Sequence, residues 1–438
     1  MKPSFRLIFL SITIIYITSN CTSYRNYGVN YYPSTLSVKK PWYKWIVKNS
    51  FPIETVSDNN DLKFLQDIIG NATLVQLGES SHGVKEFNQI KVRIIKYLHE
   101  EMDFNVIAFE SGLYECYNIN NNSSSKNPRQ LIGSIFNVWR TEEVLELFKY
   151  ILKTREAENP LILAGFDFQM SGDWDERSKM LEGIVSFLDQ NFAKELFKCD
   201  SLFAVNKKLN NITAMRSYVE KNQVELRSVY STFKRLLENN MTELTQEYKS
   251  DPLIPLYAHQ ISASMLDYIE FWLDEANEMS IRDKAMADNV SFLRSTIYPD
   301  EKIIIWAHNL HIRHKNEHLD QTEYNKTKSM GSWLHERYPE DLYTIGLYMY
   351  RGQATYNNKE VYTVLNHSSN SLESILHSAG HEICFVDLKH SKRVKGNLWM
   401  SKEILTKTWG LEDLKMVPID QYDAILFIDT VSPPAYLN

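Results

Sequence analysis

The stretch LVQLGESSHG, from Leu74 to Gly83, decides the fold of this chain. Its first four residues form a mostly apolar run, Gly78 ends that run, and a segment with helical periodicity covers residues 84–102. A short apolar run that stops at a glycine before an amphipathic segment is typical of a buried strand, a tight turn and a helix. The stretch therefore predicts a strand–turn–helix unit whose turn carries Glu79 and His82.

Similar apolar runs recur along the chain. An amphipathic segment over residues 142–155 separates two of them, so strands alternate with helices. The further expected strands are residues 106–109, 161–164 and 302–306, with weaker candidates at 343–348, 383–388 and 424–428. Strands that alternate with helices indicate a sheet covered on both faces. We expect an α/β fold with a mainly parallel sheet flanked by helices.

A long glycine-free block interrupts this pattern. No glycine occurs between Gly183 and Gly331, while Leu, Lys and Glu recur at helical spacing. Helices are expected over residues 206–247, with a break, and over 256–298 after Pro255, because proline is common at helix starts. We therefore expect an α/β catalytic domain formed by residues 62–185 and 300–438, with an α-helical insertion at 186–299.

The first residues have the pattern of an export signal. Lys2 and Arg6 precede an apolar stretch over residues 7–17, which is too short for a comfortable membrane span but suits a signal peptide. The residues that lead to Cys21 resemble a bacterial lipobox, although Asn20 stands where a smaller residue is usual. We expect a lipoprotein-type signal peptide at 1–21, a tether and N-terminal segment at 22–61, and membrane anchoring through lipidated Cys21 at the bacterial cell envelope. Simple secretion is the alternative.

Composition narrows the possible partners. The 438 residues carry a formal net charge of -7, and no long Lys/Arg run is present. Binding to a phosphate backbone needs a basic surface, so nucleic acid is not an expected partner and a small molecule is. Besides Cys21 the chain has Cys116, Cys199 and Cys384, whose number and spacing predict neither a disulfide framework nor a zinc site.

Acidic residues and histidines follow four of the expected strands. Glu79 and His82 follow the first strand, and Glu110 ends the next. Asp167 follows the strand at 161–164, and His308 and His311 follow the strand at 302–306. In parallel sheets ligands bind beyond the carboxyl ends of the strands. Each residue alone could be a helix cap or an ordinary polar loop residue, but together they predict an acid/base cleft.

The residue types suit hydrolysis by activated water. An imidazole beside a carboxylate can take a proton from water, and a second histidine, Lys91 or Arg93 could hold an oxyanion. Ser80 and Ser81 lack the Gly-x-Ser-x-Gly context of a nucleophile elbow. No His-Glu-x-x-His motif occurs, so no cofactor is expected, yet a divalent metal held by histidine and glutamate stays open.

The motifs resemble those of the erythromycin esterase family. The segment from Gly78 to Gly83 is similar to that family's Gly-Glu-Ala-Thr-His-Gly, with two serines in place of Ala-Thr. The other carriers are Glu86-Phe87, Lys91, Phe109-Glu110, Trp139-Arg140-Thr141-Glu142-Glu143, Gly165-Phe166-Asp167-Phe168-Gln169, Arg282-Asp283, Met286-Ala287, Asn289, Trp306-Ala307-His308-Asn309-Leu310-His311 and Met330-Gly331, with a weaker echo in Phe427-Ile428-Asp429. They follow the family's order from about residue 74 to 335.

The resemblance implies roles for individual residues. It implies that His82 is the general base, that Glu79 and Glu110 are essential carboxylates, and that His308 completes the catalytic set. The residues expected to contact the substrate are His311, Lys91, Arg282, Asp283, Asp167 and Asn309. Three interpretations follow: an esterase or lactone hydrolase, a metal-dependent hydrolase with Glu79, His82, Glu110 and His308 as ligands, and a non-catalytic surface lipoprotein that binds a glycan or a metal complex.

Overall fold

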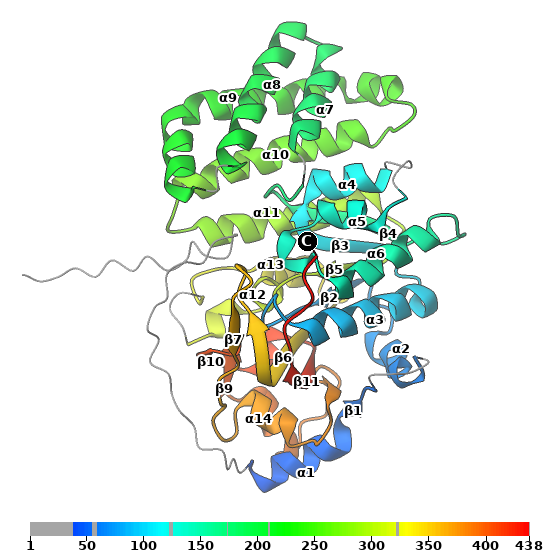
Figure 1. The fold of residues 1–438 in the computed structure, drawn as a ribbon, viewed down its shortest axis with the longest axis vertical. Coiled ribbons are helices and arrows are strands. Elements are labelled where there is room, and N and C mark those ends of the chain that lie inside the picture. Colours follow the sequence, from blue (N-terminus) through cyan, green and yellow to red (C-terminus); the bar gives the residue numbers. More distant parts are fainter. Residues whose placement is uncertain are drawn as a thin grey trace, which may run out of the picture.

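A mixed sheet flanked by helices forms the centre of the protein (Figure 1). The structure is a computed structural model that describes residues 38–54, 59–121, 126–172, 174–208, 211–320 and 324–437. Within these ranges the main sheet has nine strands, and eight of them follow the order β1-β8-β11-β6-β2-β5-β3-β4, with β7 paired to β6. The predicted α/β class with a mainly parallel sheet is confirmed.

All the predicted strands form and lie in this sheet. The strands from β11 to β4 in this order run parallel to one another, and every antiparallel pair involves β1, β7 or β8. The strands are β1 (Phe51–Pro52), β2 (Leu74–Leu77), β3 (Val106–Gly112), β4 (Ile162–Asp167), β5 (Ile303–Trp306), β6 (Leu342–Thr355), β7 (Val361–Thr363), β8 (Ile383–Asp387) and β11 (Ala424–Val431). A separate hairpin pairs β9 (Ile404–Thr408) with β10 (Glu412–Met416).

The sheet is buried on both faces because its central strands are mostly apolar. Alternate side chains of a strand point to opposite faces. In β5, Ile303 and Ile305 pack into one hydrophobic core, and Ile304 and Trp306 pack into the other. Helices α3 (Lys85–Met102) and α6 (Glu142–Thr154) cover the second face, and α11 (Glu278–Phe292) and α13 (Met330–Arg337) cover the first. The continuous apolar runs in the sequence reflect this double burial.

Shorter helices complete the sheet domain. They join the strands or close its edges, as α1 does at the base of the molecule in Figure 1. These helices are α1 (Lys40–Asn49), α2 (Phe64–Ile69), α4 (Leu113–Asn121), α5 (Pro128–Leu131), α12 (Asn309–Ile312), α14 (Leu372–His377) and α15 (Pro418–Gln421).

A helical block stands above the sheet in Figure 1. It contains α7 (Trp174–Ser186), α8 (Gln190–Lys208), α9 (Ile212–Glu247) and α10 (Ile254–Leu273). The single helix expected over residues 256–298 was wrong, because the chain turns at Asp274 and Asn277, whose side chains hydrogen-bond at 2.9 Å, before α11 begins. Helix α7 begins at Trp174 and packs on α8, so the helical block begins before residue 186, where the insertion was expected to start. The proposed division into domains stays a prediction.

The predicted signal peptide and Cys21 lie outside the described residues. Among the residues that the structure does describe, no helix is long and apolar enough to cross a membrane. Export and anchoring therefore stay predictions. The remaining cysteines, Cys116, Cys199 and Cys384, are buried free thiols.

Candidate active site

Strand register brings the predicted site residues together. Leu77 of β2 and Phe109 of β3 both pair with Trp306 of β5, so these three parallel strands end at the same level. The residues that follow them, which include Glu79, Glu110 and His308, therefore leave the sheet side by side. The strand-end argument thus accounts for the location of the site.

Two glycines fix the turn between β2 and α3. A Cβ atom on Gly78 would lie 2.0 Å from Oδ1 of Asn309, and one on Gly83 would lie 2.2 Å from the carbonyl oxygen of Thr355. Neither distance is compatible with a side chain. The turn can therefore pack against the loop after β5 and against β6 only with glycine at both ends, and this packing places Glu79 and His82.

Glu79 is a buried carboxylate with three donors. Its Oε1 accepts hydrogen bonds at 2.6 Å from His82 Nδ1 and at 2.6 Å from Trp139 Nε1. Its Oε2 accepts at 2.6 Å from Lys91 Nζ, and Lys91 also lies over the Trp306 ring. Burial raises the pKa of Glu79, but Lys91 and His82 outweigh burial, and the pKa lies below its usual value. Glu79 is therefore ionised.

His82 has one ring nitrogen committed and one that can act as a base. Because the carboxylate of Glu79 accepts from Nδ1, the hydrogen of the neutral ring lies on Nδ1, and the lone pair lies on Nε2. The ring is packed among Trp139, His308 and Trp409, with centroid separations of 5.0, 4.9 and 5.5 Å. Its side chain keeps 4% of its surface exposed, so it lies at the edge of the buried cluster.

His308 is a neutral donor beside His82. Its Nδ1 accepts a hydrogen bond of 3.2 Å from the backbone nitrogen of Leu310, while its buried Nε2 has no partner in the described structure. Burial, followed by the charge of His82, holds the pKa of His308 well below the usual value. With Nδ1 accepting, the hydrogen lies on Nε2. His308 can therefore donate to a developing negative charge.

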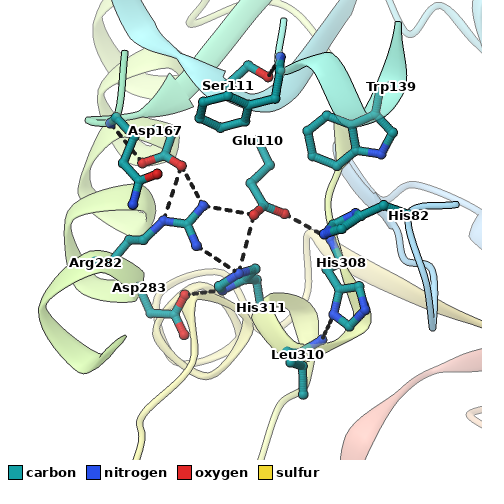
Figure 2. Close-up of polar contacts among 12 residues, drawn as sticks. His82, Glu110, Ser111, Trp139, Asp167, Arg282, Asp283, His308, Leu310 and His311 are labelled. Atoms are coloured by element: carbon teal, nitrogen blue, oxygen red, sulfur yellow. Dashed lines mark hydrogen bonds and ion pairs between the residues drawn. The ribbon is translucent and has the colours of Figure 1, made fainter. Parts of the chain in front are cut away.

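A second cluster surrounds Glu110 (Figure 2). Arg282, from α11, donates to Glu110 Oε1 at 2.9 Å and to Asp167 Oδ2 at 2.5 Å. The other oxygen of Glu110 accepts from the backbone nitrogen of His308 at 3.0 Å. Burial raises the pKa of Glu110, but His311 and Arg282 lower it further, to well below the usual value. This cluster joins the helix α11 to the ends of β3 and β4 and holds the His308 loop.

His311 is clamped between two carboxylates. Its Nδ1 hydrogen-bonds Asp283, and its Nε2 lies 3.3 Å from Glu110 Oε1. Burial lowers the pKa of His311, but Asp283 and Glu110 together raise it from 6.5 to about 10. At neutral pH this raised pKa favours the protonated ring, whose Nδ1 donates to Asp283 and whose Nε2 lies between Glu110 and Nη1 of Arg282, 3.2 Å away.

The structure brings every predicted site residue into this cluster, although two of them have mainly supporting contacts. The Asn309 side chain donates to the Leu347 carbonyl at 2.8 Å and accepts from the Leu347 nitrogen at 3.2 Å. Lys91 is fully buried beneath Glu79. The expectation that Asn309, Lys91, His311, Arg282, Asp283 and Asp167 contact a substrate stays a prediction.

Sequence reasoning gave no role to two tryptophans of the site. Trp139, in the 3₁₀ turn Asn137–Trp139, donates to Glu79, and Trp409, at the tip of the β9–β10 hairpin, stacks on His308. Trp139 belongs to one of the motifs that carry the family resemblance, so the sequence did contain an indication of its role. Trp409 lies in no motif that we identified.

The carboxylates are already engaged by cations and N–H donors. Over the described ranges, no three side chains of His, Cys, Asp or Glu are arranged to hold one metal ion. The four residues expected as metal ligands fall into two hydrogen-bonded groups. Glu79 contacts His82 and Lys91, whereas Glu110 contacts Arg282 and the backbone nitrogen of His308.

Comparison with known proteins identifies the family. Residues 99–431 match the family model described as erythromycin esterase. The chain belongs to the erythromycin esterase family. The match begins after the Glu79–His82 turn, but a longer relative includes it: "Putative hydrolase YbfO" of Bacillus subtilis is 32% identical over 426 residues, which cover 92% of this chain and 94% of that protein.

A further curated relative and two solved structures are also similar to this chain. Erythromycin esterase type II of Escherichia coli is 24% identical over 73% of this chain and 80% of its own length. A solved succinoglycan biosynthesis protein has a TM-score of 0.75 at 21% identity, over 92% of this chain and all of that one. A mutant of the erythromycin esterase EreC in its open conformation has a TM-score of 0.66 at 19% identity, over 90% of this chain and 98% of that one. The two structures share the fold, and family membership supports a hydrolase.

Proposed function

We propose that this protein hydrolyses an ester or opens a lactone with a water molecule activated by His82. The observation that carries the proposal is the 2.6 Å contact between His82 Nδ1 and a carboxylate that is itself held by Lys91 and Trp139. This contact fixes the tautomer in which Nε2 accepts a proton, and it stabilises the imidazolium that forms.

In the first step water attacks the ester carbonyl carbon. His82 Nε2 takes one proton from the water, its oxygen bonds to the carbon, and the carbonyl π electrons move to the oxygen. The His308 Nε2–H, which has no acceptor in the described structure, is the donor that supports this oxyanion. In the second step the oxyanion reforms the carbonyl, the ester C–O bond breaks, and His82 returns its proton to the alkoxide.

The Glu110 cluster has a positioning role in this scheme. Glu110 holds the backbone of His308, and Arg282 and His311 hold Glu110. Because the raised pKa of His311 favours its protonated ring at neutral pH, His311 is a poor candidate for the base. Its place is to fix Glu110 and, through Glu110, the orientation of His308.

The charges of the site residues favour base-catalysed hydrolysis over the binding of an anion. The site contains the four carboxylates Glu79, Glu110, Asp167 and Asp283, against the three cations Lys91, Arg282 and His311. A proton taken by His82 would balance the remaining negative charge. The arrangement therefore supports the protonated intermediate of a base-catalysed reaction.

The test is a hydrolysis screen with a base-deficient control. Macrolides, simple esters and acylated glycans are offered to the full chain and to His82→Ala, with His390→Ala, a surface change, as the matched control. We expect His82→Ala to lose hydrolysis while retaining its fold by circular dichroism and its affinity for the ester. Substantial residual turnover in His82→Ala would remove His82 from its role, and no hydrolysis of any class by the wild type would favour a non-catalytic binder.

The metal-dependent alternative has its own measurement. Elemental analysis of the purified protein is paired with activity after exhaustive chelation. Because Glu79 and Glu110 are occupied by Lys91 and Arg282, we expect metal-free protein to keep full activity. A loss of activity that one divalent metal restores would support the metal-dependent hydrolase instead.

We also propose that the protein is exported and anchored to the cell envelope through lipidated Cys21. The support is the sequence pattern before Cys21, with its basic start and short apolar stretch. The change Cys21→Ser is expected to move the protein from the membrane fraction to the soluble fraction. An unchanged distribution would contradict anchoring.

A further inference from the structure

Trp409 occupies an unusual position beside the two histidines of the site. Its ring stacks on His308, with centroids 5.2 Å apart and planes 27° from parallel, and meets the His82 ring edge-on at 5.5 Å and 80°. Trp409 as a residue is mostly buried but not fully so. A large apolar ring thus lies against both the proposed base and the proposed oxyanion donor.

The backbone at Trp409 is one that this residue type rarely adopts. Trp409 and Gly410 are the central residues of the β9–β10 turn, with φ angles of 56° and 67°, and the turn is closed by a hydrogen bond from Leu411 to Thr408. Gly, Asn or Asp normally fills such positions, because a bulky side chain is strained there. Strain of this kind persists where the surroundings impose it and is concentrated at functional sites.

The surroundings of the hairpin impose this position. At the tip, the Trp409 backbone nitrogen donates to the Ser80 carbonyl at 2.9 Å, inside the catalytic turn. Along strand β9, fully buried Glu373 accepts from Thr406 Oγ1 at 2.6 Å and from the Lys407 nitrogen at 2.8 Å. The hairpin is therefore held at its tip and along β9, and Trp409 cannot swing away without breaking these contacts.

We propose that Trp409 is a specificity-determining residue. Its indole binds the ring of a neutral ester whose carbonyl is held between His82 and His308. The indole face suits the C–H face of an alicyclic or sugar ring, which packs flat against an aromatic surface. The excess of carboxylates around the site disfavours an anionic ester. The inference rests on the proposed hydrolysis and adds the class of substrate to it.

The experiment compares two esters of one leaving group. Kinetics with 4-nitrophenyl acetate and 4-nitrophenyl cyclohexanecarboxylate are measured for the wild type, Trp409→Ala and Trp409→Asn. The asparagine tolerates a positive φ, so its variant keeps the turn. Trp333→Ala is the control, because Trp333 is also partly buried but packs against Lys328 and Arg337.

In both Trp409 variants we expect kcat/KM for the ring ester to fall about tenfold, mainly through KM. The acetate has no ring to bind, so it should lose less activity and the preference for the ring ester should fall in both variants. Trp333→Ala should leave this preference intact. An equal loss on both esters would show a merely structural role for Trp409, and an unchanged preference would also overturn the proposal.

A binding measurement separates failure of this inference from failure of the proposed function. N-phenylcyclohexanecarboxamide, an amide analogue of the ring ester, is titrated into the same proteins by calorimetry, which needs no turnover. A loss of affinity in Trp409→Ala and Trp409→Asn, but not in Trp333→Ala, supports the ring site even if the wild type hydrolyses neither ester. Equal affinity in all four proteins, or no binding to the wild type, overturns it.

Discussion

His82 and His311 are both buried beside carboxylates, yet their surroundings give them opposite chemistry. His82 contacts one carboxylate, Glu79, whose other oxygen is held by Lys91. His311 contacts two carboxylates, Asp283 and Glu110, and its pKa rises to about 10. The contact of the first ring with one carboxylate leaves Nε2 for the proposed reaction with water, whereas the two carboxylates around the second ring favour its protonated form at neutral pH.

The comparison teaches that the balance of charge, and not the presence of an Asp or Glu, separates a base from a fixed cation. One partly neutralised carboxylate orients an imidazole, and two carboxylates retain its proton. The fold achieves this difference within one site because β2 and α3 supply the first environment, whereas α11 and the end of β3 supply the second.

The largest expected effect comes from the carboxylate beside the base. Glu79→Gln keeps the shape but removes the charge that stabilises imidazolium, and the amide can present its nitrogen to His82. We expect kcat/KM to fall by about 10³-fold, within the range for loss of acid/base catalysis. Steady-state kinetics and a thermal melt check this result. More than a tenth of wild-type activity would mean that Glu79 does not act through His82.

A smaller loss is expected when the turn is displaced without a change in its charges. Gly83→Ala forces a Cβ to within 2.2 Å of the Thr355 carbonyl, so the His82 turn must shift. A displacement of about 1 Å can reduce turnover by about 10²-fold. In Gly133→Ala the new Cβ meets nothing within 4 Å, and activity should be retained. Equal kinetics in the two variants would contradict the packing argument.

Removal of Lys91 should shift the pH dependence more than the maximal rate. Lys91→Met leaves the charge of Glu79, the carboxylate that holds His82, without its cation. We expect about a tenfold loss of kcat/KM at pH 6 that becomes smaller as the pH rises through about 8, where Lys91 of the wild type itself loses its proton. Lys96→Met on the same helix is the control. A uniform loss at all pH values would show that Lys91 serves stability alone.

The smallest effect concerns stability. Because the pKa of His311 rises from 6.5 to about 10 on folding, its stabilising contribution is complete below pH 6.5 and is lost as pH rises toward 10. Burial lowers the pKa of Lys91 to about 8, which acts in the opposite direction at higher pH. Between pH 6.5 and 8, the free energy of unfolding should therefore fall by up to about 1.4 kcal/mol per pH unit from His311.

Urea denaturation of the wild type and Asp283→Asn over pH 6.5 to 8 measures this contribution. Asp283→Asn removes the carboxylate that raises the pKa of His311 most, so the unfolding free energy of the variant should be lower overall but should depend less on pH. Parallel curves for the two proteins would show that Asp283 does not retain the His311 proton.

Local patterns predicted most of the sheet because its strands are short, apolar and bounded by glycine or by charged residues. The turn at Asp274 and Asn277 was not predictable, since no glycine or proline marks it and only the packing of α10 and α11 requires it. The β9–β10 hairpin was missed for a related reason. Its turn has Trp409 where hairpin patterns lead one to look for Asn or Asp.

The site was predictable only as far as strand ends could place it. Glu79, His82, Glu110 and His308 follow neighbouring strands, and the parallel register of β2, β3 and β5 brings them together. The partners that give these residues distinct roles come from distant helices and loops. Sequence spacing could not reveal that Arg282 bridges Glu110 and Asp167, nor that Trp139 donates to Glu79.

The dependence of kcat/KM on pH in wild type and His82→Ala tests the central claim most directly. If His82 is the base, the wild-type rate rises with pH to a plateau as the ring loses its proton. In His82→Ala the plateau should disappear, and the small remaining rate should follow hydroxide concentration. A variant that retains the wild-type profile with only a uniform reduction would contradict the account.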